Sequence, residues 1–293
     1  MTVYLTAFFA GLGIGSVYAL VAMGYALVYS SSGVFNLAQG DIVTLGGLLT
    51  ATFVVTLRWP ALAAVFPVVA IIAVFSVVQQ KVTIAPFANQ GPASFGWFIA
   101  TLGASVAIEN GAQILWGSQP VPVPSLTSLA SVHIGSSPVE PEYLIVFGLA
   151  VAASVALWYC QSRTLLGKIW SATAEDTVGA RVRGINTARV GLGAFVIAAV
   201  VSALAGFITV PLTGAIWNAG ASLTLYAFAA ISIGGFGSPF GPLAGGLIVG
   251  VAQSESAVSI PAGYQSSIAL GLLLLVLLLR PAGLLGQRLE RVV

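Results

Sequence analysis

Nine runs of mostly apolar residues, separated by short polar or Pro/Gly-rich stretches, restrict the fold of this chain more than any other feature. A helix needs about 20 apolar residues to cross a bilayer. Helices are expected rather than strands because hydrocarbon cannot satisfy the backbone groups at an open sheet edge. The runs cover residues 7–29, 42–57, 61–78, 94–116, 143–160, 190–211, 223–233, 243–257 and 267–279. The sequence therefore predicts an all-α, polytopic membrane protein with about eight to nine membrane segments.

The composition agrees with a surface that faces lipid. Hydrophobic residues make up 58% of the 293 residues, charged residues only 6%, and the mean hydropathy is +1.03. A soluble domain usually carries about a quarter charged residues. We therefore expect one membrane domain over residues 1–293. A net charge of +2 is too small to suggest a nucleic-acid partner, and the single cysteine, Cys160, allows no cysteine metal cage.

The basic residues predict an orientation in the membrane. If the nine segments alternate in direction, nine of the ten basic residues fall on one side, which the positive-inside rule assigns to the cytoplasm. Only Arg58 falls on the other side, and the long loop 117–142 contains no Lys or Arg. The nine are Lys81, Arg163, Lys168, Arg181, Arg183, Arg189, Arg280, Arg288 and Arg291. We therefore expect an outside N-terminus and a cytoplasmic C-terminus.

Two segments are interrupted at matching places, at residues 30–41 and 234–242. Each interruption follows an inward segment and precedes an outward one, so the pattern predicts a parallel internal repeat. Broken membrane helices in corresponding positions of two halves are typical of transport pathways. The alternative is that small residues only allow close helix packing.

Six residues are candidates for the pathway: Asn36, Gln39, Asp41, Glu109, Gly235 and Gly237. Asn36 and Gln39 could hydrogen-bond a substrate or fix the turn. Asp41 is expected to cap a helix start, where the helix dipole stabilises an anion. Glu109 is expected either to line a cavity or to pair with Asn110, Gln113 or a serine.

The loop 161–189 is the one substantial cytoplasmic loop. Residues 173–183 are predicted to form a short helix, with Glu175 and Asp176 in its first turn, Arg181 and Arg183 in its last, and Gly184 as its stop. A short polar helix is marginal alone in water. It either docks onto another protein or belongs to a solvated loop that follows the positive-inside bias.

Four stretches together resemble the LivH-type permease of branched-chain amino-acid ABC importers. They are GLGIGSVYALVAMGYALVYSSSGVFNLAQGDIVTLGG, ATAEDTVGARVRGIN, AFAAISIGGFGSPFGPLAGGLIVG and LLRPAGLLG. The resemblance implies a LivM-type second permease, two cytoplasmic ATPase subunits that bind ATP and Mg, an external substrate-binding protein, and a bacterial inner-membrane location. It also implies that the loop helix couples the ATPases to the pathway. Members of the broad family also carry urea, amides or aromatic acids.

Two other classes of function compete with an importer subunit. The chain has no GxxxxGK[ST] phosphate loop, so ATP would be hydrolysed by another subunit. A secondary transporter or channel that works alone would also suit broken helices, but it does not need the loop helix. A membrane enzyme would need clustered catalytic groups, and one His and one Cys make that class unfavourable. We expect no cofactor on this chain.

Overall fold

The computed structural model describes residues 2–87, 95–127, 131–134, 137–259, 261 and 264–286. Arg288, Arg291 and the first residue of the predicted run 94–116 lie outside the described residues. Within them the chain forms eleven α-helices, one π-helical turn and one hairpin. The prediction of an all-α membrane protein is confirmed.

Six helices of the described residues are long and apolar enough to cross a membrane. They are α1 (Thr2–Ser32), α2 (Gln39–Ala51) with the π-helical turn η1 (Thr52–Thr56), α3 (Ala61–Thr83), α4 (Gly96–Trp116), α5 (Pro141–Arg163) and α8 (Thr187–Thr213). The remaining apolar runs form α10 (Phe240–Ser259) and the shorter α9 (Gly220–Gly234) and α11 (Gln265–Leu279). All nine apolar runs are therefore helical.

The residues gather into two compact units. Unit 1 comprises Met1–Ala26, Leu129–Trp158 and Leu225–Val293, and unit 2 comprises Leu27–Ser128 and Tyr159–Thr224. The chain passes from one unit to the other inside α1, α5 and α9, so neither unit is a separate stretch of sequence. The assignment of 1–293 to a single permease domain stays a prediction.

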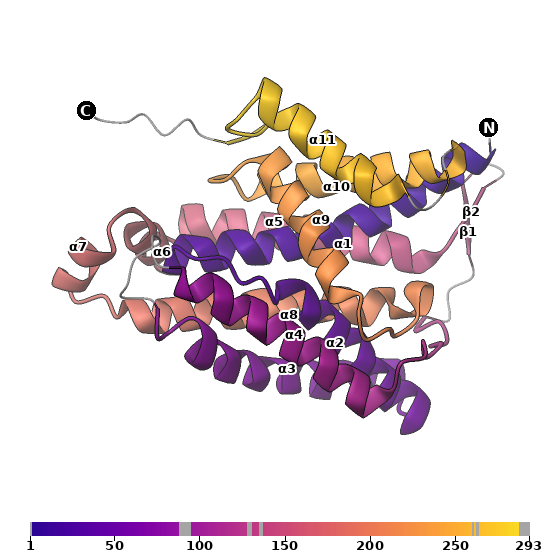
Figure 1. The fold of residues 1–293 in the computed structure, drawn as a ribbon, viewed down its shortest axis with the longest axis horizontal. Helices are drawn as coiled ribbons and strands as arrows, with labels where there is room; N and C mark the ends of the chain where they lie inside the picture. Colours follow the sequence, from indigo (N-terminus) through magenta and orange to yellow (C-terminus); the bar gives the residue numbers. More distant parts are fainter. Residues whose placement is uncertain are drawn as a thin grey trace. The chain divides into compact units, whose positions relative to one another are not determined.

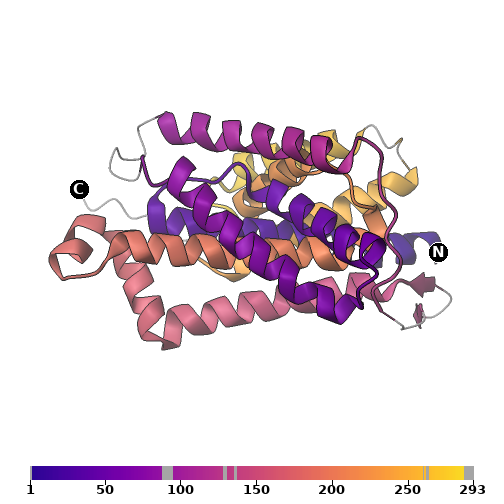
Figure 2. The same ribbon diagram turned by 90° about the horizontal axis from the view of Figure 1, so that it is seen from below.

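Unit 2 is built on α2, which packs along α8, with α3 against both helices and α4 on α2 and α3 (Figures 1 and 2). Small residues allow the close α2–α8 contact. A Cβ on Gly46 would meet the backbone of Ala203, and a Cβ on Gly206 would meet the backbone of Val43. Backbones that approach so closely are typical of helix pairs in membranes.

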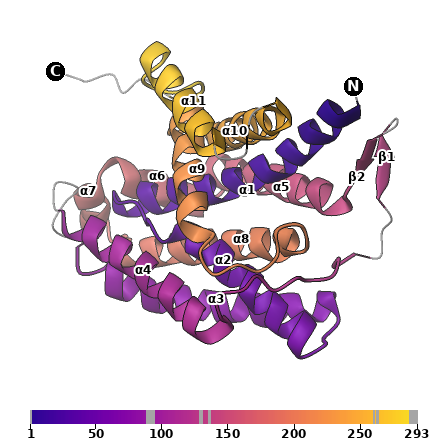
Figure 3. The same ribbon diagram turned by 45° about the vertical axis from the view of Figure 1, so that its right-hand side comes forward.

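In unit 1, α10 lies beside α11 (Figure 3) and also packs closely on the first part of α1. A Cβ on Gly246 would meet the backbone of Gly15, and a Cβ on Gly250 would do the same. Within this contact the Tyr18 hydroxyl donates a 2.8 Å hydrogen bond to Gln253 Oε1. The packing again depends on glycines, and one buried polar pair fixes its register.

The loop before α5 contains the only strands among the described residues, β1 (Val132–Ile134) and β2 (Ser137–Val139). They pair antiparallel, with Val132 opposite Val139. The sequence predicted no strand here. A three-residue strand is too short to give a clear alternation of apolar and polar residues.

Candidate functional site

The first break, between α1 and α2, is held by side-chain amides of unit 2. Asn36 Oδ1 accepts a hydrogen bond from Ala38 N at 3.2 Å, and Asn36 Nδ2 donates to Gln39 Oε1 at 3.1 Å. Gln79 of α3 donates to Asn36 Oδ1 at 3.3 Å. Asn36 thus fixes the turn, as one of the two sequence-based alternatives proposed.

Gln39, the first residue of α2, joins this turn to α8. Its Nε2 donates to Ser202 Oγ at 2.9 Å and to the carbonyl oxygen of Ala198 at 3.1 Å. Asn36 and Gln39 are both 0% exposed. Every buried polar group of this kind needs partners, and here the protein itself supplies them.

The start of α9 completes the first break. The Thr224 hydroxyl donates to the carbonyl oxygen of Leu37 at 3.1 Å and accepts from Gly40 N at 3.2 Å. Gly40 has no room for a side chain, because a Cβ would collide with Gly220 and Thr224. The first turn of α9 is therefore seated directly on the first turn of α2.

Asp41 does not cap α2, so that prediction is wrong. The helix begins at Gln39, which places Asp41 inside the first turn, and Ala38 occupies the N-cap position without a side-chain hydrogen bond. The Asp41 side chain is 0% exposed, and apart from the nearby Ser105 hydroxyl no described side chain approaches its carboxylate as a donor. Its carboxylate instead occupies the space where Gly220, at the start of α9, lacks a side chain.

Glu109 of α4 reaches the same helix start. Its Oε1 accepts a hydrogen bond from Ala221 N at 3.2 Å. The neighbouring Asn110 donates to the carbonyl oxygen of Val106 in its own helix at 2.7 Å. The alternative in which Glu109 pairs with Asn110, Gln113 or a serine is therefore wrong, because its partner is a backbone amide at a helix N-terminus.

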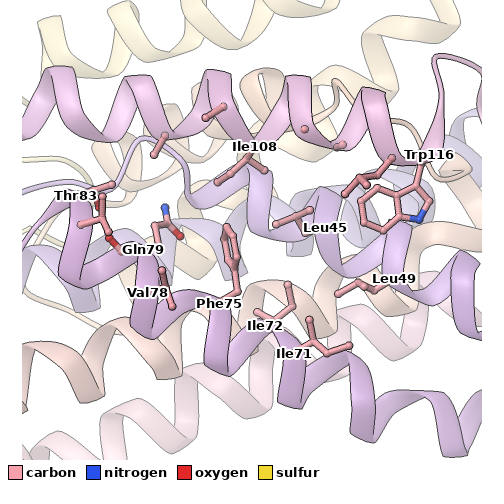
Figure 4. A pocket seen from close by; sticks show the side chains of 16 residues that line it. Leu45, Leu49, Ile71, Ile72, Phe75, Val78, Gln79, Thr83, Ile108 and Trp116 are labelled. Atoms are coloured by element: carbon pink, nitrogen blue, oxygen red, sulfur yellow. The ribbon is translucent and has the colours of Figure 1, made fainter.

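A groove of about 490 Å³ runs between α2, α3 and α4 of unit 2 (Figure 4). Leu45 and Leu49 of α2, Phe75 of α3 and Ile108 of α4 point into it, and the Gln79 amide lies at one end. Such a lining suits hydrocarbon and gives a polar solute few partners. The polar cluster around Asp41, rather than this groove, is the candidate site for a polar solute.

The second break lies in unit 1, between α9 and α10, and is held by backbone groups. Gly235 and Gly237 have φ angles of +90° and +96°, which L side chains rarely adopt. The amides of Leu284 and Leu285 donate to the carbonyl oxygens of Ile233 and Gly234 at 2.8 and 2.9 Å. The segment after α11 thus folds back and satisfies the last carbonyls of α9.

The loop 161–189 of unit 2 contains two helices instead of the single predicted helix 173–183. They are α6 (Leu165–Glu175) and α7 (Thr177–Val182). Asp176 is extended, with φ −146° and ψ 96°, and its carboxylate accepts from Val178 N and Gly179 N at 3.0 and 2.9 Å. An aspartate that caps the following helix ends the preceding one, so Glu175 lies in a last turn and not in a first.

The other end of α7 agrees with the sequence. Gly184 has a φ angle of +83° directly after the last turn, and Ile185 N donates to the carbonyl oxygen of Ala180 at 3.0 Å. Gly184 is therefore the predicted stop. Arg181 Nε donates to Thr187 Oγ1 at 2.9 Å, which ties α7 to the first residue of α8.

Basic residues of unit 2 gather at one end. A small pocket brings together Ser31 near the end of α1, Ile84 after α3, Arg181 of α7 and Thr187 of α8. Lys81, Arg163, Lys168, Arg183 and Arg189 belong to the same helix ends and loop. Arg58 follows η1, at the opposite end of α2 and α3. Within unit 2 the charge asymmetry seen in the sequence is therefore also an asymmetry in space.

Comparison with known proteins identifies the family. Residues 7–277 match the family described as "Branched-chain amino acid transport system / permease component". The chain belongs to this family. The high-affinity branched-chain amino acid transport system permease protein LivH of Salmonella typhimurium is 31% identical over 97% of this chain and 96% of its own length. BraD of Pseudomonas aeruginosa, which carries the same description, is 30% identical over 97% and 96%.

A sugar permease is also related at lower similarity. The ribose import permease protein RbsC of Haemophilus influenzae is 27% identical over 90% of this chain and 81% of its own length. The predicted resemblance to LivH-type permeases is confirmed, and the chain is a permease component of a transport system. Membership in this family does not favour a secondary transporter or channel that works alone.

Proposed function

We propose that this chain is one of two permease subunits of an ATP-driven importer for branched-chain amino acids or a related small polar solute. The names of LivH and BraD supply the substrate class. In this proposal a second, LivM-type permease completes the pathway, and a substrate-binding protein delivers the solute from outside. Two ATPase subunits, which hold ATP and Mg, dock on the cytoplasmic side.

The exposed face of α7 is the observation that carries the ATPase-docking part of this proposal. Val178 and Val182 are 72% and 84% exposed, and they lie four residues apart on one side of the helix. Arg183, which follows Val182, and Glu175, at the end of α6, are also exposed. A loop that is only solvated does not need two large apolar side chains on one face. A rim of charges around an apolar centre is typical of a protein interface.

The contacts of unit 2 give a mechanical route from α7 to the site. Arg181 ties α7 to Thr187 at the start of α8, and Ser202 and Ala198 of α8 hold Gln39 at the start of α2. A displacement of α7 by the ATPase would therefore move α8 and then the first break. Among the residues predicted for coupling, Glu175 and Arg183 would touch the ATPase, whereas Asp176, Arg181 and Gly184 would shape and anchor α7.

The six pathway candidates also divide into residues that contact a partner molecule and residues that hold the structure. We propose that Asp41 and Glu109 face the solute, whereas Asn36 and Gln39 hold the first break and Gly235 and Gly237 shape the second.

The membrane is the bacterial inner membrane, with the N-terminus outside and the C-terminus in the cytoplasm. A tag after Val293 should be accessible only from the cytoplasm, and a cysteine at Ser131 should react with an impermeant reagent from outside.

The docking of ATPases on α7 can be tested with a double variant, Val182→Asp with Arg183→Glu. Each lost charge-assisted contact is worth about 1.5–3 kcal/mol, and about 1.4 kcal/mol is tenfold in affinity. Copurification of the ATPase should therefore fall more than tenfold, while the permease still inserts and folds. The matched control, Val182→Thr with Arg183→Lys, keeps shape and charge and should copurify normally. Full ATPase content in the double variant would show that α7 is not the docking element.

A further inference from the structure

A buried carboxylate without a cationic partner among the described residues lies inside the membrane region of unit 2. Asp41 is 0% exposed, and the Ser105 hydroxyl is close to its carboxylate, but no described residue meets full hydrogen-bond geometry with either oxygen. Two glycines place the carboxylate there. Gly40 allows the start of α2 to contact the start of α9, and Gly220 leaves the space that the carboxylate occupies. A buried charge of this kind is costly unless something pairs with it.

A second carboxylate meets the same helix start. Glu109 of α4 accepts from Ala221 N at 3.2 Å, directly beside Gly220, and its charge acts on Asp41. The Ser105 hydroxyl, one helical turn before Glu109, also faces Asp41. Asp41 and Ser105 are buried, at 0% and 7% exposed, whereas Glu109 is only partly buried and its bond to Ala221 lies at the surface of unit 2.

The negative charge of Asp41 and Glu109 exceeds the positive charge that the described residues place near them. Within the described part of the chain, no Lys or Arg forms an ion pair with Asp41 or Glu109. The N-terminus of a helix carries the equivalent of about half a positive charge. In the first turn of α9, one backbone amide already donates its hydrogen bond to Glu109. Two carboxylates therefore face roughly half a compensating charge, and the group as a whole attracts a cation.

The acceptors suit a primary ammonium group in number and kind. An ammonium has three N–H donors and no acceptor. Asp41 offers two free oxygens, Glu109 keeps one that is not used by Ala221, and the Ser105 hydroxyl can accept as well. Thr44, one turn after Asp41 on the same face of α2, is 6% exposed, and its hydroxyl also lacks a partner.

We propose that Asp41, Ser105 and Glu109, at the first turn of α9, form a site for the ammonium group of the solute in transit. This rests on the proposed import function and narrows it to solutes that carry a cationic amine. A neutral urea or amide leaves the excess negative charge uncompensated. A carboxylic acid without an amine is repelled by it. Among the substrates of the broad family, the site selects amino acids.

The test uses the complete transport complex in proteoliposomes, with its binding protein outside and ATP inside. Asp41→Asn and Glu109→Gln each remove a charge and nearly preserve shape, and a glutamine at 109 can still accept from Ala221 N. We expect each variant to take up labelled leucine at least tenfold more slowly, with normal ATPase content. Asn110→Ala, which loses only a bond to its own helix, is the control and should transport at the unmodified rate.

A second readout avoids the specificity of the binding protein. Detergent-purified complex without the binding protein is heated with isopentylamine or with 4-methylpentanoate, which share one hydrocarbon group. A ligand that binds the folded state raises its melting temperature, so the amine should do so and the acid should not. Glu109→Gln should abolish the effect of the amine, and this holds even if Asp41→Asn fails to fold.

The outcomes distinguish a failure of the proposed ammonium site from a failure of the proposed import function. Unmodified leucine uptake in both neutral variants, or an amine effect that survives Glu109→Gln, would overturn the ammonium site and leave the importer intact. Leucine uptake by the unmodified complex that does not need ATP would overturn the proposed function. The melting experiment would still report on the site in that case.

Discussion

The two breaks occupy matching places in the sequence pattern but are stabilised in different ways. The first is held by side-chain amides, with Asn36 and Gln39 bonded to each other and to α3 and α8. The second is held by backbone amides of Leu284 and Leu285 on the last carbonyls of α9, with Gly235 in a left-handed conformation. Both solutions satisfy polar backbone that lipid cannot satisfy.

The difference predicts how each break tolerates change. At the first break, several side-chain hydrogen bonds share the stabilisation of the turn. Each bond contributes about 1 kcal/mol net, so the loss of one is tolerated. A backbone turn built on glycines has no space to adjust, because the clash of one added methyl group is with main chain. We therefore expect the second break to be the more sensitive of the two to a single small substitution.

Gly235→Ala should give the largest effect. The substitution places a Cβ against the backbone of Gly286 and Ala282 at a φ angle of +90°. Strain of about 1–3 kcal/mol adds to the clash, so we expect a loss of about 3 kcal/mol or more and low expression. Gly237→Ala has a φ angle of +96° but no atom within 4 Å of the new Cβ, so it should lose only the strain. Equal melting temperatures for the Gly235→Ala and Gly237→Ala variants would show that the clash at Gly235 does not contribute to the loss of stability.

Gln39→Leu should give the next largest effect, about 2–4 kcal/mol. The change leaves Asn36 and Ser202 with unpaired buried groups, each of which costs about 1–3 kcal/mol. Thermal unfolding of the purified protein and leucine uptake should both decline. Gln79→Leu removes one bond of 3.3 Å from the same network and should cost about 1 kcal/mol. If Gln39→Leu unfolds no earlier than Gln79→Leu, Gln39 does not organise the first break.

Leu284→Pro should cost about 1 kcal/mol, because it removes one backbone donor to the carbonyl oxygen of Ile233. Leu284→Ala keeps the donor and should unfold close to the unmodified temperature, since this side chain is 37% exposed. The comparison separates the backbone bond from the side chain. A larger loss in the alanine variant would mean that the side chain, not the amide, holds the second break.

Ser30→Ala should have the smallest effect, below about 0.5 kcal/mol. Its hydroxyl donates only to the carbonyl oxygen of Leu27 in its own helix, at 3.0 Å. The melting temperature should stay within error of the unmodified protein. A clear loss would show that the hydroxyl groups before Gly33 also contribute to the first break.

The sequence predicted the parts of the fold that depend on local pattern. All nine apolar runs are helices, both breaks lie where the glycines and polar residues placed them, and Gly184 ends α7. The internal repeat stays a prediction. The sequence does not predict the division at Asp176, because an acidic pair such as Glu175–Asp176 is typical of one first turn, whereas the carboxylate of Asp176 caps a new helix.

The sites depend on contacts that span the sequence, and no local pattern reveals these. Gln39 meets Ser202, and Asp41 and Glu109 meet the successive residues Gly220 and Ala221. The sequence did contain two signals: a short apolar run that begins after a polar, glycine-containing stretch, and two acidic residues, Asp41 at the end of the first interruption and Glu109 within an apolar run. Only the packing of α2, α4 and α9 shows that they belong together.

The most direct test of the account measures whether the chain works with ATPase subunits. The chain is purified from its native membrane with whatever subunits accompany it, reconstituted, and assayed for leucine uptake and ATP hydrolysis with loaded binding protein. We expect two copurifying ATPases, hydrolysis stimulated by leucine-loaded binding protein, and no uptake without ATP. Uptake driven by an ion gradient alone, with no ATPase in the preparation, would contradict it.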